Sequence, residues 1–307
     1  SAFRSQSRGG KGSVGVKMKA EDVVQTLLTV NTHDTLLLFT DSGRVFKLKA
    51  FEIPESSRTA KGTAIVNILS LKQDERVRSV LIVDEVADAE KFITLVTRKG
   101  LIKKTPIKLF DNIRQNGIIA ITLNSDDALV GSKVTNNSDD IMIISKEGKS
   151  IRFSEVEVKS SQRDTKGVKG ITLRKEDFVV GFEVIRAEEL DASNDTTQLL
   201  IVTENGMGKR TRLDQYPKQK RSGMGDKVAE ITKKTGLVAT ARKVNTELHK
   251  DTVITTLDGQ TIKMPLSKKT VPVLSRPTQG VILMRLKADN KVAAVAVTFT
   301  QEDDGEE

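Results

Sequence analysis

Hydrophobic and polar positions alternate along the chain in an order that recurs. Five segments each begin with an apolar run, continue through a short polar turn that contains glycine, and end in a second alternating stretch. These segments are residues 35–48, 92–105, 141–153, 199–211 and 253–264. Turn sequences such as Asp-Ser-Gly and Asp-Gly favour a tight reversal, because glycine adopts positive φ at no steric cost. Each segment is therefore predicted to form a β-hairpin.

A second pattern follows each hairpin and also precedes the first one. It opens with a glycine, alternates through a short strand, turns, and ends in another apolar strand. Six glycines open its copies: Gly12, Gly62, Gly117, Gly167, Gly225 and Gly280. The sequence thus holds six second halves and five hairpins, so the pattern starts in the middle of a repeat. Each full unit predicts four short strands.

Units of this length cannot each bury a face alone, but they can do so when they are stacked around an axis. We therefore predict an all-β fold over residues 1–300, a six-bladed β-pinwheel or propeller-like closed ring of four-stranded blades. The incomplete first repeat favours a ring, because a ring can close by sharing strands between its first and last units. An open β-solenoid is the alternative.

Composition removes most ordinary enzyme chemistry. The chain has no Cys, which excludes disulfides, thiolate catalysis and Cys-ligated zinc. Its two histidines leave little for a metal site or a catalytic triad. Tyr216 occupies a position that repeats in other units, which favours packing over catalysis. No run approaches the roughly 18 apolar residues that cross a membrane. We expect a cytoplasmic, non-catalytic chain without cofactor or metal.

Charge is distributed unevenly along the chain. Residues 301–307 contain five carboxylates and no base, and they are expected to form an acidic, disordered tail. The whole chain carries a net charge of +9, and the remaining 300 residues carry +14. A strongly basic body predicts an anionic partner.

Basic residues recur at fixed positions of the repeat. One arginine stands three or four residues before each second-half glycine: Arg8, Arg58, Arg114, Arg163, Arg221 and Arg276. Further bases lie beside these glycines or follow the hairpin turns: Lys11, Lys61, Lys166, Lys218, Lys220, Arg44, Lys47, Lys49, Lys103, Lys104, Lys149, Arg152, Lys209, Arg210, Arg212 and Lys263. Equivalent positions of a ring share one rim, so these cations are predicted to bind duplex DNA without reading its sequence. The plainer alternative is that exposed strands carry bases for solubility.

The segment QSRGGKG resembles the Q-R-R-G-G-[RK]-G box of the C-terminal domain of the DNA gyrase A subunit, and residues 32–62 resemble the sequence after that box. The resemblance extends over the whole chain. It implies a six-bladed β-pinwheel that bends and wraps DNA, with a box that makes the wrap effective for negative supercoiling. The box residues are Gln6, Ser7, Arg8, Gly9, Gly10, Lys11 and Gly12. Ser7 replaces the usual arginine and removes one cation.

The resemblance also implies a parent enzyme, an ATP-dependent type II topoisomerase whose other domains use ATP and magnesium. The implied partners are duplex DNA, the gyrase B subunit, and the N-terminal breakage-reunion domain that precedes this one in its own chain. The isolated domain is expected to be monomeric and to act at the bacterial nucleoid. Two alternatives stay open. One is the C-terminal domain of topoisomerase IV, and the other is a propeller that serves as a protein-interaction platform.

Overall fold

All five expected hairpins are present in the computed structural model, which describes residues 6–11, 28, 30–55 and 63–299. The strand pairs are β1 (Thr35–Thr40) with β2 (Arg44–Lys49), β4 (Phe92–Thr97) with β5 (Leu101–Pro106), β8 (Asp140–Ser145) with β9 (Lys149–Ser154), β12 (Thr197–Thr203) with β13 (Met207–Arg212), and β16 (His249–Thr256) with β17 (Thr261–Pro265). Each turn glycine has a positive φ of 80° to 83°. The predicted hairpins are therefore confirmed.

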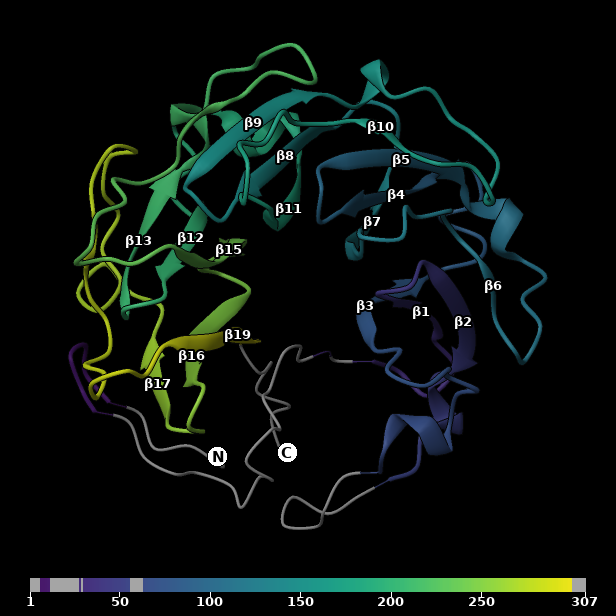
Figure 1. Cartoon of the computed structure of the whole chain (residues 1–307), viewed down its shortest axis with the longest axis horizontal. Coiled ribbons are helices and arrows are strands. Elements are labelled where there is room, and N and C mark those ends of the chain that lie inside the picture. Colours follow the sequence, from purple (N-terminus) through teal and green to yellow (C-terminus); the bar gives the residue numbers. More distant parts are fainter. Residues whose placement is uncertain (1–5, 12–27, 29, 56–62, 300–307) are drawn as a thin grey trace, which may run out of the picture.

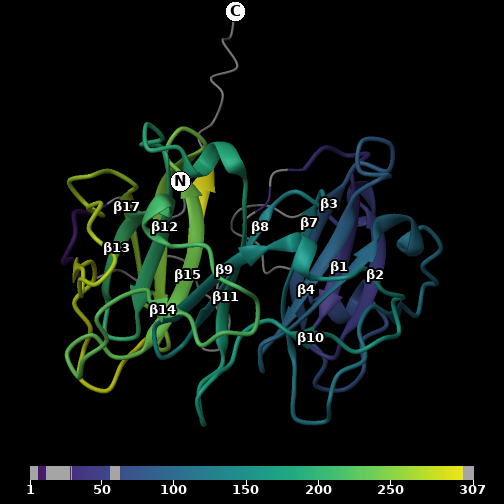
Figure 2. The same ribbon diagram turned by 90° about the horizontal axis from the view of Figure 1, so that it is seen from above.

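A third strand pairs with the first strand of each hairpin and lies nearest the central axis (Figure 1). These inner strands are β3 (Val77–Val83), β7 (Leu129–Thr135), β11 (Val179–Ile185), β15 (Val238–Asn245) and β19 (Val292–Phe299). The sheets surround one axis, as a ring predicts and an open β-solenoid does not (Figure 1). Seen from above, their strands run through the thickness of the ring (Figure 2).

The outermost strand of a sheet comes from the next unit along the chain. Four two-residue strands take this place: β6 (Ile118–Ile119) on β2, β10 (Val168–Lys169) on β5, β14 (Asp226–Lys227) on β9 and β18 (Val281–Ile282) on β13. All four pairings are antiparallel. Strand exchange of this kind joins each blade to its successor.

Short 3-10 turns complete the described secondary structure. Four of them follow hairpins: η1 (Ala50–Glu52), η3 (Ile107–Phe110), η4 (Glu155–Glu157) and η6 (Leu213–Gln215). The other two are η2 (Ile65–Asn67) and η5 (Ala187–Leu190). The described residues contain no helix long and apolar enough to span a membrane. The all-β prediction is confirmed.

The number of blades differs from the predicted six. The described residues form five sheets, four of four strands and one, β17-β16-β19, of three. The prediction counted second halves, whereas each sheet is built on a hairpin, and the sequence has five hairpins. Residues 12–27, which hold most of the second half without a hairpin, lie outside the described part of the chain, as does the acidic tail.

The hydrophobic core lies between neighbouring blades. Alternate residues of one strand pack on opposite neighbours: Leu199 and Ile201 of β12 contact residues of β8, and Leu200 and Val202 contact those of β16. This two-sided burial explains why the first hairpin strands are continuous apolar runs. Tyr216 belongs to the same core at 1% exposure, and burial raises the pKa of its hydroxyl. Its predicted packing role is confirmed.

Strand exchange predicts that two glycine substitutions will lower the free energy of unfolding by very different amounts. Gly225 precedes β14 with φ of +70°, and an added Cβ would lie 2.2 Å from the Ser150 carbonyl oxygen on β9. Gly225→Ala should lower the free energy of unfolding by at least about 3 kcal/mol, since it combines backbone strain with a backbone clash. Urea titration of the purified chain measures this loss.

Gly259→Ala is the matched control. Gly259 has a similar φ of +81°, but nothing lies within 4 Å of its added Cβ. Strain alone should then cost about 1 kcal/mol. Equal losses for the two variants would contradict the importance of the exchanged strand.

Candidate nucleic-acid interface

One cation recurs four residues after every hairpin glycine, and the structure places it within the blade. Each of these side chains has a polar partner: Lys47 with Glu85 at 2.8 Å, Lys104 with Glu155 at 3.4 Å, Arg152 with Asp140 at 2.6 Å, Arg210 with the Gln198 amide oxygen at 2.9 Å, and Lys263 with Asp251 at 3.2 Å. Lys104 and Arg210 are only 2% and 1% exposed. Three of these bonds join the two strands of one hairpin, and the bonds of Lys47 and Lys104 join a hairpin to a flanking segment.

Two further lysines in the hairpin strands are buried and donate hydrogen bonds to backbone carbonyls. The Lys103 ammonium donates to the Ala120 carbonyl at 2.8 Å and to the Arg163 carbonyl, and the Lys209 ammonium donates to the carbonyls of Ser275, at 2.8 Å, and Arg276. Burial lowers the pKa of each amine to about 8. Both lysines thus anchor the loop that precedes the next unit's outermost strand.

The remaining predicted cations of the hairpin strands are partly neutralised or half-buried. Arg44 pairs with Glu75 at 2.7 Å, and Arg212 pairs with Asp214 at 2.9 Å. Lys49 lies 3.8 Å from Glu85. Lys149 is half-buried and has no carboxylate partner in the described part of the chain.

Three of the recurrent arginines lie in the loop before one outermost strand and bond to the previous outermost strand. The guanidinium of Arg163 donates to the Ile119 carbonyl at 3.1 Å, and that of Arg276 donates to the Lys227 carbonyl at 2.9 Å. Arg221 makes the same bond to the Lys169 carbonyl. Each acceptor is the second residue of an outermost strand. Since its partner is neutral, each arginine ties two units together and keeps its positive charge.

The outer loops present the most accessible cations. Each loop runs from a hairpin to the next outermost strand, as residues 107–117, 155–167, 213–225 and 266–280, and passes over the outside of the ring (Figure 1). Arg114 and Lys220 are exposed and have no carboxylate partner among the described residues. Lys166 is exposed beside the neutral side chain of Asn124, whereas exposed Lys218 pairs with Asp140 at 2.7 Å. The outer perimeter therefore carries uncompensated positive charge.

Lys159 is one cation of these loops that the sequence analysis did not single out. Its side chain is exposed, and no described carboxylate pairs with it. The position shows no repeat register, so only its place between a hairpin and a second-half glycine could have indicated it. Arg58, Lys61 and Gly12 lie outside the described residues.

The box segment docks on the last blade in the same way as the outer loops dock on theirs. The backbone amide of Gln6 donates to the Lys263 carbonyl at 2.7 Å. Three loops make the equivalent bond: Ser161 to Lys104, Gln219 to Arg152 and Leu274 to Arg210, at 2.7 to 2.8 Å. Arg8 and Lys11 remain exposed. Residues 6–11 thus continue the repeat beyond the last blade, in the place where ring closure was predicted.

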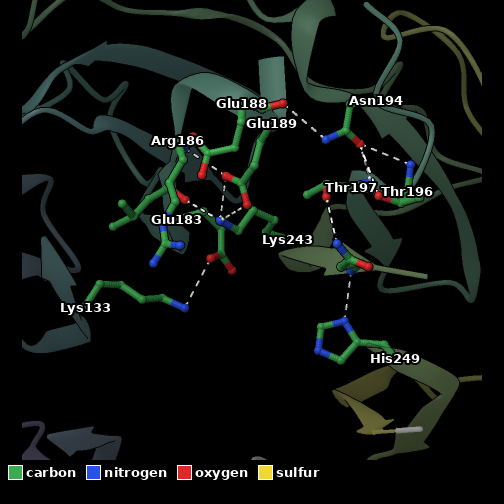
Figure 3. A network of polar contacts seen from close by, with 12 residues as sticks. Lys133, Glu183, Arg186, Glu188, Glu189, Asn194, Thr196, Thr197, Lys243 and His249 are labelled. Carbon is green, nitrogen blue, oxygen red and sulfur yellow. Dashed lines mark hydrogen bonds and ion pairs between the residues drawn. The ribbon is translucent and has the colours of Figure 1, made fainter. Parts of the chain in front are cut away.

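By contrast, two lysines of the inner strands pair with carboxylates near the axis. Lys133 on β7 lies 3.1 Å from Glu183 on β11, and the Lys243 ammonium on β15 lies 2.7 Å from Glu189 (Figure 3). The His249 side chain accepts a hydrogen bond from the backbone amide of Asn245, and burial lowers the pKa of its imidazole. No cluster of metal-ligating side chains occurs in the described part of the chain.

These features define a propeller-like ring of small antiparallel sheets with a cationic outer perimeter. The chain belongs to the family described as DNA gyrase C-terminal domain, beta-propeller, whose model matches residues 1–31, 34–84, 91–136, 139–186, 197–245 and 250–298. Each of the six matched segments contains one of the six second halves of the sequence pattern.

Curated relatives are named as the A subunit of DNA gyrase. The chain is 38% identical to the protein of Staphylococcus aureus strain MRSA252 over 100% of this chain and 34% of that protein. It is 38% identical to the protein of strain NCTC 8325 / PS 47 over 96% of this chain and 32% of that protein. The chain therefore spans about a third of the length of these relatives.

Two solved structures share the fold. A DNA gyrase A C-terminal domain superposes with a TM-score of 0.74 at 22% identity, covering 96% of this chain and 92% of that one. The C-terminal domain of a DNA topoisomerase IV superposes with a TM-score of 0.75 at 22% identity, covering 88% and 80%.

The hydrogen bonds from the recurrent arginines predict that two substitutions at the same register will differ in their effect on the free energy of unfolding. Arg163→Ala removes the bond to the Ile119 carbonyl and should lower the free energy of unfolding by about 1 kcal/mol. Arg114→Ala should leave it unchanged, because Arg114 is exposed and has no polar side-chain partner among the described residues. Urea unfolding of both variants decides the matter, and equal effects would contradict the tie.

Burial of Lys209 predicts a pH dependence of stability. Its pKa is about 8 in the folded chain and 10.5 as a free side chain, so between these values the unfolded chain binds the extra proton. The free energy of unfolding should then rise with pH in this window, by up to about 1.4 kcal/mol per pH unit. The native chain should therefore gain stability relative to Lys209→Met when the pH is raised from 7.5 to 9.5. Urea unfolding of both proteins at these two pH values measures this gain.

Lys220→Met controls for general effects of pH, since Lys220 is exposed. Its stability difference from the native chain should be the same at both values. A pH-independent difference for Lys209→Met would show that this amine titrates normally.

Proposed function

We propose that this chain binds duplex DNA without sequence preference and bends it along the outer perimeter of the ring. The observation that carries this proposal is that successive outer loops present exposed cations, Arg114, Lys159 and Lys220, with no carboxylate partner among the described residues. Loop 266–280 has three basic residues and no acidic residue, although Lys268 pairs with Asp195 at 2.6 Å. Segment 6–11 has two basic residues and no acidic residue. A curved line of positive charge suits a polymer that carries negative charge at regular intervals.

Physical magnitudes support wrapping as well as binding. Duplex DNA carries one negative charge per about 1.7 Å of axis. When lysine and arginine side chains bind its phosphates, condensed counterions are released. Bending 20–30 base pairs by 40–90° costs roughly 1–6 kcal/mol. Several phosphate contacts around the perimeter offset that cost at moderate salt. No recognition helix is present among the described residues, which agrees with binding that does not read bases.

The proposed contacts are a subset of the predicted ones, with Lys159 added. They comprise the cations of the outer loops and of the box, together with the half-buried Lys149: Arg8, Lys11, Arg114, Lys149, Lys159, Arg163, Lys166, Lys218, Lys220, Arg221 and Arg276. Lys103, Lys104, Lys209 and Arg210 are left out, because their buried side chains present no charge to a ligand at the surface.

The parent protein follows from the named relatives and remains part of the proposal. We infer that it is the gyrase A subunit of an ATP-dependent type II topoisomerase, in which this chain wraps DNA and supports negative supercoiling without catalysing a reaction itself. DNA, the breakage-reunion domain and the gyrase B subunit would be its partners at the bacterial nucleoid. The isolated domain would be a monomer.

The second candidate, a C-terminal domain of topoisomerase IV, has a similar fold but less support. The fold alone does not separate the two, because both solved domains match with nearly equal TM-scores. The near-complete box at residues 6–12 favours gyrase, as do relatives at 38% identity that carry that name. A protein-interaction platform would bind DNA weakly, with little dependence on salt.

Salt titration of binding to a random-sequence duplex tests the proposed function. With 6–10 phosphate contacts, affinity should fall by about 10³ to 10⁵ between 50 and 200 mM salt. Lys220→Ala should reduce the slope of log affinity against log salt by about one. Lys133→Ala should not change it, because Lys133 lies near the axis and pairs with Glu183. Near-equal native affinity at both salt concentrations would refute the proposal.

A further inference from the structure

The place where the box segment docks on the last blade differs from every other described junction of the ring in its side chains, although its backbone bonds are the same. The residue three positions after each outermost strand donates its amide to the incoming segment. These bonds run from Thr122 to Thr165, Thr172 to Gly223, Glu230 to Thr278 and Arg285 to Gly10, at 2.9 to 3.2 Å. The backbone frame therefore offers a direct comparison of the four junctions.

Arg285 occupies a position where the other junctions have uncharged or acidic side chains. Thr122 and Thr172 use their hydroxyls to donate to the carbonyls of Asp164 and Ser222, each at 2.7 Å. The third equivalent residue, Glu230, carries a negative charge. The Arg285 side chain is exposed and has no polar partner among the described residues. Among these four junctions, only this one thus offers a guanidinium at this position.

The same junction lacks a carboxylate that two others possess. Asp127 and Asp177 stand ten residues after Gly117 and Gly167, and the residue ten after Gly280 is the neutral Asn290. Asn290 keeps one structural bond of its counterparts, since its side-chain oxygen accepts from the backbone amide of Lys291 at 2.9 Å, as those of Asp127 and Asp177 accept from the next residue. The turn is therefore preserved while its negative charge is absent.

Gly9 leaves the Arg285 guanidinium uncovered. Its φ is +77°, and an added Cβ would lie 3.8 Å from the Arg285 Nε atom. The Gly9 amide donates to the Leu283 carbonyl at 2.7 Å, which fixes this bare backbone beside the arginine. A side chain at this position would lie against the guanidinium and reduce its exposure.

An open hollow of about 490 Å³ adjoins this arginine. Lys234, Arg285 and Lys287 line it, with Asp289 as the one carboxylate of the described lining. The pKa of the Asp258 carboxyl is lowered mainly by the hydrogen bond from Thr256, and nearby Lys287 contributes to the same shift. The lining remains net positive, and exposed Arg8 and Lys11 stand on the docked segment next to Gly9 and Gly10.

We propose that this hollow is a distinct phosphate-binding site, in which Arg285, with Lys234 and Lys287, binds the backbone of duplex DNA that has been wrapped around the ring. The inference rests on the proposed DNA-binding function and adds to it a site outside the outer loops. A duplex that follows the perimeter must pass this junction to complete its path, whereas a short duplex can bind elsewhere on the rim. Loss of the site should therefore affect long DNA selectively.

The test compares two duplexes with the purified chain and Arg285→Ala. One duplex of about 15 base pairs spans about 50 Å and serves as the unwrapped probe. The other, of about 150 base pairs, carries a donor and an acceptor dye at its ends to report bending. With the long duplex, Arg285→Ala should lower end-to-end energy transfer to about half and reduce the salt slope by about one. Affinity for the short duplex should change by less than about twofold.

Arg174→Ala is the matched control, because Arg174 is an exposed arginine at the register position of Lys287 in another unit. It should keep the energy transfer of the native chain. Arg285→Lys should also keep it, since the charge is retained, and unchanged unfolding midpoints will show that all variants fold. Equal loss on both duplexes, or an Arg285→Ala result like that of Arg174→Ala, would overturn the site. Absence of DNA binding by the native chain would instead overturn the proposed function.

Discussion

The open edge of each hairpin is the constraint on which this structure depends. A hairpin with one inner strand leaves the backbone groups of its second strand without partners, and such an edge favours uncontrolled pairing. Here the next unit supplies a two-residue strand, and a loop amide then bonds the carbonyl four residues after the turn glycine, as Ser161 does with Lys104. The chain must therefore travel along the outside of every blade it leaves. The outer loops, and the charge they carry, follow from that route.

Covering the edge also divides the cations into two groups. The second hairpin strand lies beneath the exchanged strand and the loop before it, so the basic side chains of that strand are buried. Lys209 there binds loop carbonyls, and Arg210 beside it bonds the Val271 carbonyl at 2.8 Å. The loops themselves remain on the surface, and Lys220 is exposed. The same residue type therefore stabilises the fold at one register and is free to meet a ligand at another.

Sequence patterns predicted the local structure better than the contacts between units. Glycine turns between alternating runs predict hairpins because both signals lie within a few residues, and all five hairpins were found. Alternation alone placed Lys104 at the surface, since nothing in its neighbourhood shows that a segment more than 50 residues away covers it. The blade number was overestimated for a related reason, because a second half contributes its first strand to the preceding sheet. Repetition of arginine was visible, but the bond from Arg163 to the Ile119 carbonyl requires the folded arrangement.

The backbone is the same at the four described junctions of the ring, but the side chains are not. One junction therefore differs from the rest. Identical docking bonds at Gly10, Thr165, Gly223 and Thr278 show that the frame itself does not distinguish the box segment from an ordinary loop. The difference is carried by side chains that do not enter the frame: Arg285 in place of threonine, Asn290 in place of aspartate, and no side chain at Gly9. Changes confined to such positions leave the backbone hydrogen bonds of the frame intact while they raise the local positive charge. Residues that contribute to the frame are constrained by folding, so a ligand-dependent distinction between junctions can develop only at positions like these.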